Sequence, residues 1–412
     1  MPKLDKVVSL RHPDPSVTAK LKVEHPELQV YGSWAKLSIK KSGGMKARLA
    51  FTSFIWKGHL YVGGGLGETK GPCFRDLWRL NLSKLNTWES LPPYPFREDH
   101  TGVWMCWNMK VYKDKAYMFT GLQEISVFDL NAQEWTTVHS TYKPTNADIA
   151  AGVETGRKWP YIFWNSQRST QEIVGDKLYV FGGTHGKTVM GCNLFMVLDL
   201  KTLEWRRLSG VVQTGLVADY SSPGPRRNPS SWVSRDKKRI YLIFGECDRT
   251  AASMNNEPHG AEMGFAYEDF WSWDIAKEEW RLERLVGNVP SPRSEAACTY
   301  NEKLDKTFVF GGYNPGLVTV SGLRMFPFTY YGDTFMWCPS GTSPAGQWKQ
   351  VLTRGFPTYR AQSQFVSDPD TGKIYLFGGY VNTEAVPSRK DYNSRTFGDV
   401  WQLRVDLPGG CF

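Results

Sequence analysis

Short apolar runs that end in a pair of small residues recur along the whole chain. A representative copy is Leu178-Tyr-Val-Phe-Gly182-Gly183, and the small pairs follow one another at spacings of 56, 62, 63, 66 and 67 residues. The six copies occupy 60–65, 116–121, 178–183, 240–246, 307–312 and 374–379. Runs that are apolar on both faces, rich in Tyr, Val, Ile and Phe and bounded by turn residues are typical of strands buried between neighbouring layers. The pattern predicts one strand-rich unit repeated six times.

A second strand, with an acid or amide at its start, follows each run. Five copies have an Asp or Asn two residues before a Trp or Phe, and the second copy has only Ser126-Val-Phe128-Asp129. The five residues are Asp76, Asn193, Asp269, Asp333 and Asp399. A lone Trp follows the next turn at Trp88, Trp135, Trp205, Trp280 and Trp348. The sixth copy ends without one, and Trp34 stands at the other end of the chain, so we expect 34–39 to be the outermost strand of the last unit, beside 399–405.

The glycine pair, the spaced aromatic residue and the lone Trp together resemble the kelch motif, over residues 34–407. The resemblance implies that each repeat is one four-stranded blade and that the chain is an all-β, six-bladed kelch β-propeller, with galactose-oxidase-like central domains as the broader superfamily. Radial repetition leaves only short sheet edges, and an N-terminal strand around Trp34 would close the last blade. Two copies depart from the motif, with Thr120-Gly121 and Gly245-Glu246 in place of the glycine pair.

We expect a basic N-terminal arm over 1–30 and the propeller over 31–408, with blades starting near 48, 97, 168, 226, 293 and 360. Of the formal net charge of +9, residues 1–48 carry +6, from ten Lys/Arg against four Asp/Glu, which leaves +3 for the remaining 364 residues. A nucleic-acid reader carries its excess charge on the folded surface as well, so a solvated arm is the favoured interpretation, without nucleic-acid or membrane partners.

The seven cysteines are dispersed and form no CxxC pair, and the N-terminus has no apolar segment typical of a signal peptide. Both features favour reduced thiols and a cytoplasmic or nuclear location. We expect a monomer.

Long connections are expected on one face of the propeller. With the strands of a blade labelled a to d from the axis outward, the b–c and d–a connections emerge on the same face. The long segments are all of these two kinds: 247–267, 313–331 and 380–397 between b and c, and 92–103, 139–168 and 209–229 between d and a. Loops of this length are uncommon in compact domains and often functional, and these are rich in aromatic residues, so this face is the predicted binding face.

An arginine precedes the inner strand of every blade: Arg48, Arg97, Arg168, Arg226, Arg293 and Arg360. One interpretation is structural, with each guanidinium tied to carbonyls or an acid nearby, and we favour it for most of them. The other is a positive funnel for carboxylate or phosphate, which Arg binds through two parallel hydrogen bonds. The kelch resemblance supports the second, because kelch adaptors of ubiquitin ligases hold acidic peptide segments with arginines on this face. Arg168 and Arg360 have no acid within three positions and are expected to be the freest.

The predicted ligand-binding set adds five residues to these arginines: Trp164, His185, Tyr313, Tyr331 and Tyr380. No catalytic residue, metal or cofactor is predicted. The best acidic cluster, over 246–262 with Cys247 and His259, has no fixed metal-ligand spacing, and solvated loop acids are the favoured interpretation. The expected function is a non-catalytic scaffold that binds an acidic or phosphorylated protein segment. The alternatives are a metal-dependent or small-molecule enzyme resembling nitrile-specifier proteins or galactose oxidase, and a lectin-like sugar binder.

Overall fold

The computed structural model describes residues 29–68, 73–95, 108–153, 155–162, 164–185, 191–212, 221–247, 265–315, 319–321, 324–326, 329–340, 344–381, 395–407 and 410–411. Within these ranges nearly all regular structure is β-strand, and the helix α2 is a short segment over Asn146–Ala150. No helix in the described ranges is long and apolar enough to cross a membrane.

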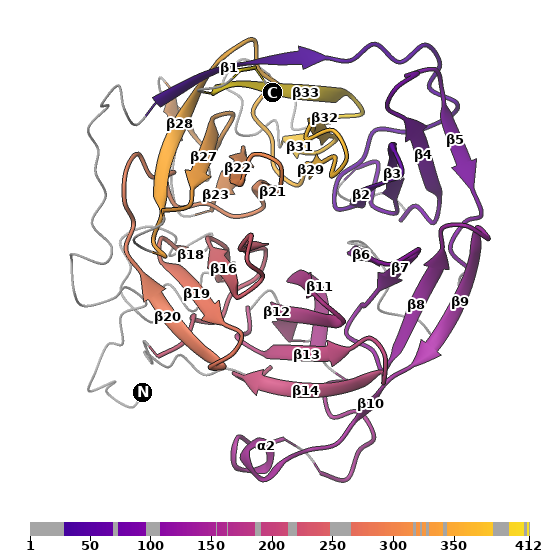
Figure 1. Cartoon of the computed structure of the whole chain (residues 1–412), viewed down its shortest axis with the longest axis vertical. Helices are drawn as coiled ribbons and strands as arrows, with labels where there is room; N and C mark the ends of the chain where they lie inside the picture. The colour runs from indigo at the N-terminus through magenta and orange to yellow at the C-terminus, as the bar shows by residue number, and fades with distance from the viewer. Residues whose placement is uncertain are drawn as a thin grey trace.

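The strands form small antiparallel sheets, which we number I to VI, placed around a common centre in a propeller-like arrangement (Figure 1). Sheet I contains β2 (Thr52–Trp56), β3 (His59–Gly63), β4 (Leu77–Asn81) and β5 (Trp88–Leu91), and sheet II contains β6 (Met109–Tyr112), β7 (Lys115–Met118), β8 (Glu124–Asp129) and β9 (Glu134–His139). Sheet III contains β11 (Trp164–Val174), β12 (Lys177–His185), β13 (Phe195–Asp199) and β14 (Glu204–Ser209), with β10 (Thr141–Tyr142) parallel at its outer edge. Sheet IV contains β15 (Ser230–Val233), β16 (Arg239–Ile243), β19 (Phe270–Asp274) and β20 (Glu279–Glu283).

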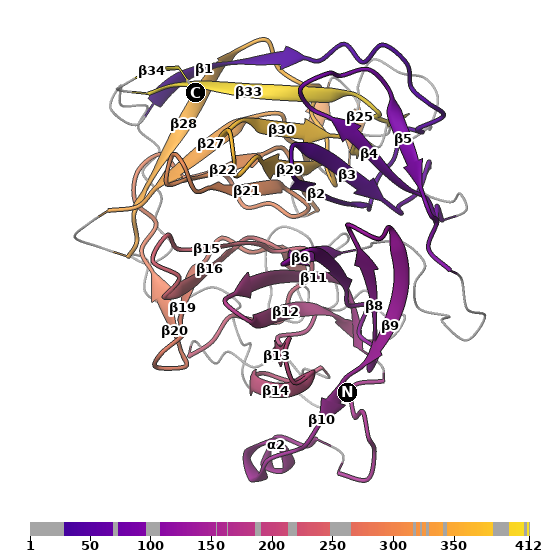
Figure 2. The same ribbon diagram turned by 45° about the vertical axis from the view of Figure 1, so that its right-hand side comes forward.

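Sheets V and VI are joined through the N-terminal strand. Sheet V contains β21 (Ala297–Asn301), β22 (Lys306–Phe310), β27 (Thr334–Cys338) and β28 (Gln347–Arg354), and sheet VI contains β29 (Gln364–Ser367), β30 (Ile374–Phe377), β33 (Val400–Leu407) and β1 (Gln29–Lys36). β1 pairs antiparallel with β33, with Trp34 opposite Leu403, and parallel with β28. Figure 2 shows β1 along β33 at the rim. The strand that contains Trp34 thus lies beside the expected partner, but it begins earlier than predicted and ends at Lys36.

Each outer-strand Trp packs against the preceding sheet. Trp205 of sheet III lies 4.5 Å from Phe119 of sheet II, and Trp88 of sheet I lies 5.4 Å from Phe377 of sheet VI, measured between ring centroids. Trp34 follows the same rule, because its ring lies 5.3 Å from that of Phe310 in sheet V. Its indole Nε1 also donates a hydrogen bond to the Thr334 hydroxyl at 3.2 Å. The N-terminal strand therefore supplies the same inter-sheet contact as the fourth strand of the other sheets.

The inner hairpins end in left-handed backbone positions that explain the glycine pairs. At Gly379, φ is 97°, and a Cβ there would lie 2.8 Å from the Ala361 carbonyl oxygen, so a side chain would clash with the segment just before the inner strand β29 of the same sheet. In sheet IV the two left-handed positions are Phe244 (φ 66°) and Gly245 (φ 92°). The pair assigned from the sequence as Gly245-Glu246 is therefore displaced by one residue, and Phe244 adopts a conformation that glycine adopts in most sheets.

In sheets I to IV, the turns between the third and fourth strands are stabilised by the same kind of side-chain hydrogen bond. The carboxylate Oδ1 of Asp129 accepts hydrogen bonds from the backbone N–H groups of Asn131 and Ala132, at 3.0 and 2.9 Å. The corresponding residues Asn81, Asp199 and Asp274 do the same. Asp and Asn favour such turns because their short side chains replace a backbone acceptor. These turns are short, as predicted.

Several short strand pairs lie in the connections between second and third strands. They are β17 (Glu246–Cys247) with β18 (Phe265–Ala266), β23 (Tyr313–Asn314) with β26 (Thr329–Tyr330), β24 (Thr319–Ser321) with β25 (Arg324–Phe326), and β31 (Tyr380–Val381) with β32 (Arg395–Thr396). A further strand, β34 (Gly410–Cys411), pairs with β33. The antiparallel order of each sheet brings these connections to one end of the molecule's axis.

Trp34→Ala should lower the free energy of unfolding by about 3–5 kcal/mol, because the large ring is buried between two sheets and its loss leaves a cavity. The measurement is urea unfolding followed by Trp fluorescence and far-UV circular dichroism. Tyr31→Ala on the same strand is the matched control, since that ring is 65% exposed. Equal effects of the two substitutions would show that β1 does not hold sheets V and VI together.

Candidate functional site

Four arginines of the predicted set occupy the same buried position in four sheets. Arg48, Arg226, Arg293 and Arg360 have no exposed surface. In sheet VI, Arg360 Nη1 donates to the Gly378 carbonyl at 3.0 Å and to Asp399 Oδ1 at 2.7 Å, and Nε donates to the Thr358 carbonyl at 2.9 Å. The other three make the equivalent contacts with Asp76, Asp269 and Asp333. We call this arrangement the arginine clamp.

Aromatic residues complete each clamp. A ring lies over every guanidinium, with centroid distances from 3.7 to 4.8 Å, supplied by Phe74, Tyr267, Tyr331 and Phe397. In sheets I, IV and VI the Trp two residues after the Asp donates its indole N–H to the same carboxylate, at 2.6–2.8 Å. A charge-assisted pair in which Nη1 and Nη2 both reach the carboxylate, with further bonds to backbone carbonyls, is the arrangement that makes a buried guanidinium tolerable.

The clamps support the structural interpretation of these four arginines and correct two expectations. Arg360 was expected to be free because no acid lies nearby in the sequence, but Asp399 reaches it from the start of β33. Tyr331 was expected on the ligand surface, and its ring instead covers the guanidinium of Arg293 at 4.1 Å. Buried and paired with an Asp, these four arginines present no exposed guanidinium to an anion.

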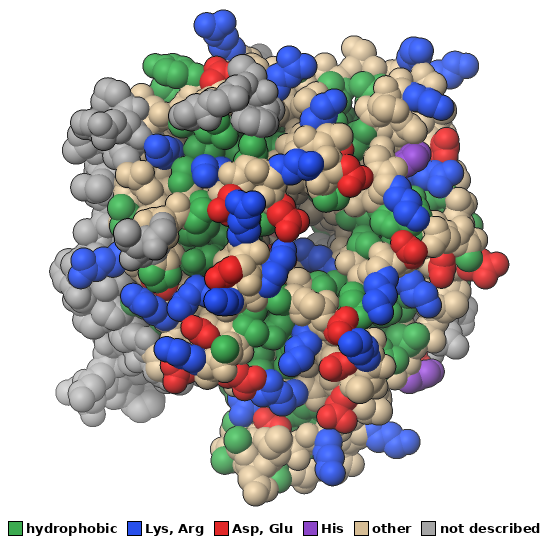
Figure 3. All heavy atoms as spheres, viewed as in Figure 1, with side chains coloured by type: hydrophobic (Ala, Val, Ile, Leu, Met, Phe, Trp, Pro, Cys, Tyr) green, Lys and Arg blue, Asp and Glu red, His purple; other side chains and the backbone are tan. Residues whose placement is uncertain are grey.

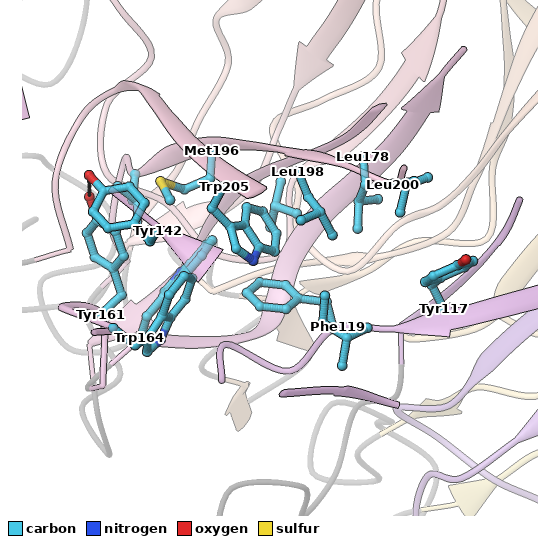
Figure 4. Close-up of a cluster of buried hydrophobic side chains, with 14 of the residues drawn as sticks. Tyr117, Phe119, Tyr142, Tyr161, Trp164, Leu178, Met196, Leu198, Leu200 and Trp205 are labelled. Atoms are coloured by element: carbon cyan, nitrogen blue, oxygen red, sulfur yellow. Dashed lines mark hydrogen bonds between the residues drawn. The ribbon is translucent and has the colours of Figure 1, made fainter. Parts of the chain in front are cut away.

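Sheet III replaces the clamp with uncharged groups. Trp164 is 3% exposed, and its indole Nε1 donates to the Gly182 carbonyl at 2.8 Å, which is the contact that the clamp arginine makes in other sheets. The position of the clamp Asp is held by Asn193, whose Oδ1 accepts from the Val211 backbone N–H. Figure 4 shows Trp164 packed among the aromatic residues between sheets II and III. Because both charges are absent together, no unpaired ion is buried. Trp164, predicted as a ligand contact, is thus part of the core.

Arg168 is the arginine that the repeat predicts before the inner strand of sheet III. It lies four residues after Trp164, which makes the clamp contact in that sheet. It follows Trp164 on β11, where the pairing with β12 shifts register between Asn165 and Ser169. Its side chain is partly exposed, and the only electrostatic contact recorded for it among the described residues is with Glu295. Its carbonyl accepts from the Asn228 backbone N–H at 2.7 Å. Of the two arginines expected to be freest, Arg168 is the one outside a clamp. Arg97 and the side chain of His185 lie outside the described parts of the structure.

A set of polar residues that the sequence analysis missed lies two positions after the clamp arginines. Asn228, Glu295 and Gln362 have φ values of 51°, 55° and 50°. Glu295 Oε1 accepts from the side-chain amides of Asn228 at 3.3 Å and Gln362 at 2.6 Å, and the Gln362 backbone N–H donates to the Glu295 carbonyl at 3.0 Å. These side chains thus link sheets IV, V and VI near the axis. These residues could have been found from the repeat, because each lies two positions after a clamp arginine.

A second carboxylate lies beside this set. Glu246 is buried, and its Oε1 accepts from Arg227 Nε at 3.1 Å, while its Oε2 accepts from the Tyr313 hydroxyl at 2.7 Å. Burial and the charge of Glu246 raise the pKa of Glu295 to about 7, although Arg168, Gln362 and Arg227 act in the opposite direction. Glu295 is therefore divided between its protonated and ionised forms near neutral pH.

Two predicted tyrosines meet next to these carboxylates. Tyr313 on β23 stacks against Tyr330 on β26 with centroids 5.7 Å apart, and Tyr380 on β31 packs edge-on against Tyr330 at 5.9 Å. All three are half-buried. We call Tyr313, Tyr330 and Tyr380 the tyrosine cluster. Burial and the Glu246 charge raise the pKa of Tyr313, so its hydroxyl stays protonated and donates to Glu246.

Within the described ranges no group of three or more His, Cys, Asp or Glu side chains is placed to hold a metal ion. Of the acidic cluster considered from the sequence, the described members are Glu246, which is paired with Arg227, and Cys247, which is buried. Residues 248–264 lie outside the described ranges.

Comparison with known proteins agrees with the repeat pattern. The family model of the KLHDC2/KLHL20/DRC7 Kelch-repeats domain matches residues 165–312. Human Kelch domain-containing protein 10 is 23% identical over 355 residues, covering 84% of this chain and 65% of that protein. The N-(sulfonatooxy)prop-2-enimidothioate sulfolyase of Thlaspi arvense is 25% identical over 228 residues, and the match spans 54% of this chain and 55% of that enzyme.

A solved structure titled "Structure of YjhT" superposes with a TM-score of 0.56 at 13% sequence identity, covering 89% of this chain and 97% of that one. This likeness concerns the fold alone. The fold and its repeated clamps define an all-β, propeller-like repeat protein. The family-model match and the Kelch domain-containing relatives support a kelch-repeat family for this chain.

Asp333→Asn should lower the free energy of unfolding by about 3–5 kcal/mol, because it leaves the guanidinium of Arg293 buried without a counter-charge. Adding Arg293→Met to the same chain should recover part of that loss, since the pair is then removed together. Urea unfolding of the single and double variants measures both.

Asp129→Asn is the matched control, because Asn81 performs the same turn function in sheet I. We expect a change within about 0.5 kcal/mol there. If Asp333→Asn were as mild as this control, the clamp would not be a structural ion pair.

Proposed function

We propose that this chain is a non-catalytic kelch platform that binds a protein segment at the axial end where the connections between second and third strands lie. The match to the kelch-repeat family supports the general role, because kelch-repeat domains commonly mediate protein interactions. The observation that carries the location is the tyrosine cluster beside Glu295, on which Arg168 also acts, at this end of the axis. Tyrosine and arginine are among the residue types most enriched among interface anchors.

We further propose that the bound segment is acidic or phosphorylated and that Arg168 is the residue that recognises its charge. The four clamp arginines are committed to Asp partners, so the original ring of six is reduced to Arg168 among its described members. An exposed guanidinium forms paired hydrogen bonds with carboxylate or phosphate. The neighbouring carboxyl of Glu295 is partly protonated near neutral pH, so it opposes an incoming anion less than an ordinary glutamate would.

The architecture that we propose for this platform is a six-bladed propeller over 31–408, with β1 as the strand that closes the last blade and 1–30 as a basic arm. The support for closure is the antiparallel register between β1 and β33, together with the packing of Trp34 against sheet V.

Arg168→Ala should weaken binding of an acidic peptide by about ten- to hundredfold, the loss expected for one charge-assisted hydrogen-bonded contact. The probes are peptides selected from a random library against the intact protein, each compared with a counterpart in which Asp and Glu are replaced by Asn and Gln. Affinity is measured by fluorescence anisotropy.

Arg235→Ala is the matched control, because Arg235 is a 65% exposed arginine in the turn between β15 and β16, at the opposite end of the sheets. It should leave affinity unchanged. Binding that survives Arg168→Ala, or peptides whose affinity does not depend on acidic residues, would refute the acidic specificity. Peptides insensitive to both Arg168→Ala and Tyr330→Ala would place the binding surface elsewhere.

A further inference from the structure

The inner strands enclose a polar cavity along the axis of the molecule. Its volume is about 200 Å³, and every sheet contributes lining residues, among them Thr52, Lys110, Gln171, Ser231, Cys298 and Gln364. Figure 3 shows a hollow near the centre of the face it displays. Typical pockets for drug-sized molecules measure roughly 300–1,000 Å³, so this axial cavity has room for a small molecule or a single side-chain group.

Three buried oxygen atoms on the cavity wall accept no hydrogen bond from any described protein group. They are Gln171 Oε1, Glu295 Oε2 and Gln362 Oε1. Gln171 is 1% exposed. In the described part of the chain, every other buried side-chain atom without a partner is a hydroxyl or an indole N–H. The unsatisfied atoms that can act only as acceptors are therefore all gathered in one cavity, and a buried acceptor left without a donor is costly.

Neighbouring hydrogen bonds fix the direction of these oxygens. The Gln171 amide donates through Nε2 to the Phe119 carbonyl at 3.3 Å, and the Gln362 amide donates through Nε2 to Glu295 Oε1 at 2.6 Å. Since each amide nitrogen is turned to its own partner, each Oε1 is the atom left to meet a ligand.

The charges around the cavity are balanced except at Glu295. Glu172 accepts from the Ser231 hydroxyl at 2.7 Å and lies 3.7 Å from Lys110 Nζ, while Glu246 is paired with Arg227 outside the lining. Glu295 Oε1 is held by two neutral amides, and Oε2 has no partner. Glu295 is thus the cavity carboxylate whose second oxygen has no donor.

We propose that the axial cavity binds a small cation that carries several N–H donors, the chemistry of a primary ammonium group. Glu295 is its counter-ion, and the Oε1 atoms of Gln171 and Gln362 are neutral acceptors. This chemistry is shared by a free small amine and by a lysine side chain of a bound segment. The site is distinct from the anion contact at Arg168, which does not line the cavity but acts electrostatically on Glu295.

Binding of such a cation should be coupled to release of a proton. A nearby positive charge favours the ionised form of Glu295, whose pKa without ligand is about 7. The other charged or titratable groups that act on Glu295 or face it are Glu246, Arg168, Arg227, Tyr313 and Tyr380. Affinity should therefore rise as the pH increases through the pKa of Glu295 and fall as the pH decreases below it.

The test is isothermal titration calorimetry of the full chain with methylammonium chloride at millimolar concentration. Tetramethylammonium chloride, with the same charge but no N–H donor, is the ligand control, and n-butylammonium imitates a lysine side chain. We expect methylammonium to bind and tetramethylammonium not to bind. Tighter binding of n-butylammonium would assign the cavity to a side chain, and weaker binding would assign it to a small free amine.

Glu295→Gln keeps the shape of the side chain and should weaken methylammonium binding by about ten- to hundredfold. It should also abolish proton release, which is read from titrations in buffers of different ionisation enthalpy. Glu89→Gln, on an exposed carboxylate of sheet I paired with Arg79, is the matched control and should change neither quantity.

Equal heats for methylammonium and tetramethylammonium, or unchanged affinity in Glu295→Gln, would overturn the proposal. Absence of binding to the wild-type chain would show that the cavity is filled by water alone. Because these titrations use no peptide, they can fail while the peptide-binding role at Arg168 survives, and the reverse also holds.

Discussion

The buried pair between a clamp arginine and the Asp at the start of the third strand is the interaction on which the rest of the structure depends. Each clamp connects three separate segments: the turn before the inner strand, the end of the second strand and the start of the third. A guanidinium with no exposed surface is tolerable only when all these contacts are made, so the ion pair forces the three segments into one geometry. Sheet III reaches the same geometry with Trp164 and Asn193, which shows that the position, rather than the charge, is what the repeat requires.

The clamp also determines what faces the axis. Two residues after the arginine the backbone turns into the left-handed region at Asn228, Glu295 and Gln362. The buried arginine thus recurs from sheet to sheet and keeps the scaffold constant. The residue two positions after it differs between sheets, and these residues give the axial cavity its chemistry. A repeat protein can in this way keep its inter-sheet contacts and still vary the surface that meets a ligand.

Much of the fold could be predicted from the sequence, because strand period, glycine pairs and the spaced Trp are local patterns. Trp34 was expected beside 399–405 for this reason and lies opposite Leu403, but of the expected strand 34–39 only 34–36 belong to β1. The site was harder to predict, because its contacts join residues far apart in the chain. Arg360 finds its acid 39 residues later, a separation at which no local search for a counter-charge succeeds. In sheet III the arginine nearest the expected position was Arg168, whereas the clamp contact is made by Trp164. Asn193 in place of Asp is visible in the sequence, but the register shift in β11 leaves no local signal.

The described arginines of the repeat are of two kinds: four are buried in clamps, and Arg168 is partly exposed near the axial cavity. Modification of the native protein with phenylglyoxal, followed by peptide mass spectrometry, measures this directly, because the reagent reacts with accessible guanidinium groups. The account predicts rapid modification of Arg168 and of the exposed Arg235, and protection of Arg48, Arg226, Arg293 and Arg360 until the chain unfolds. Modification of the four clamp arginines at the rate of Arg235 in the folded protein would contradict it.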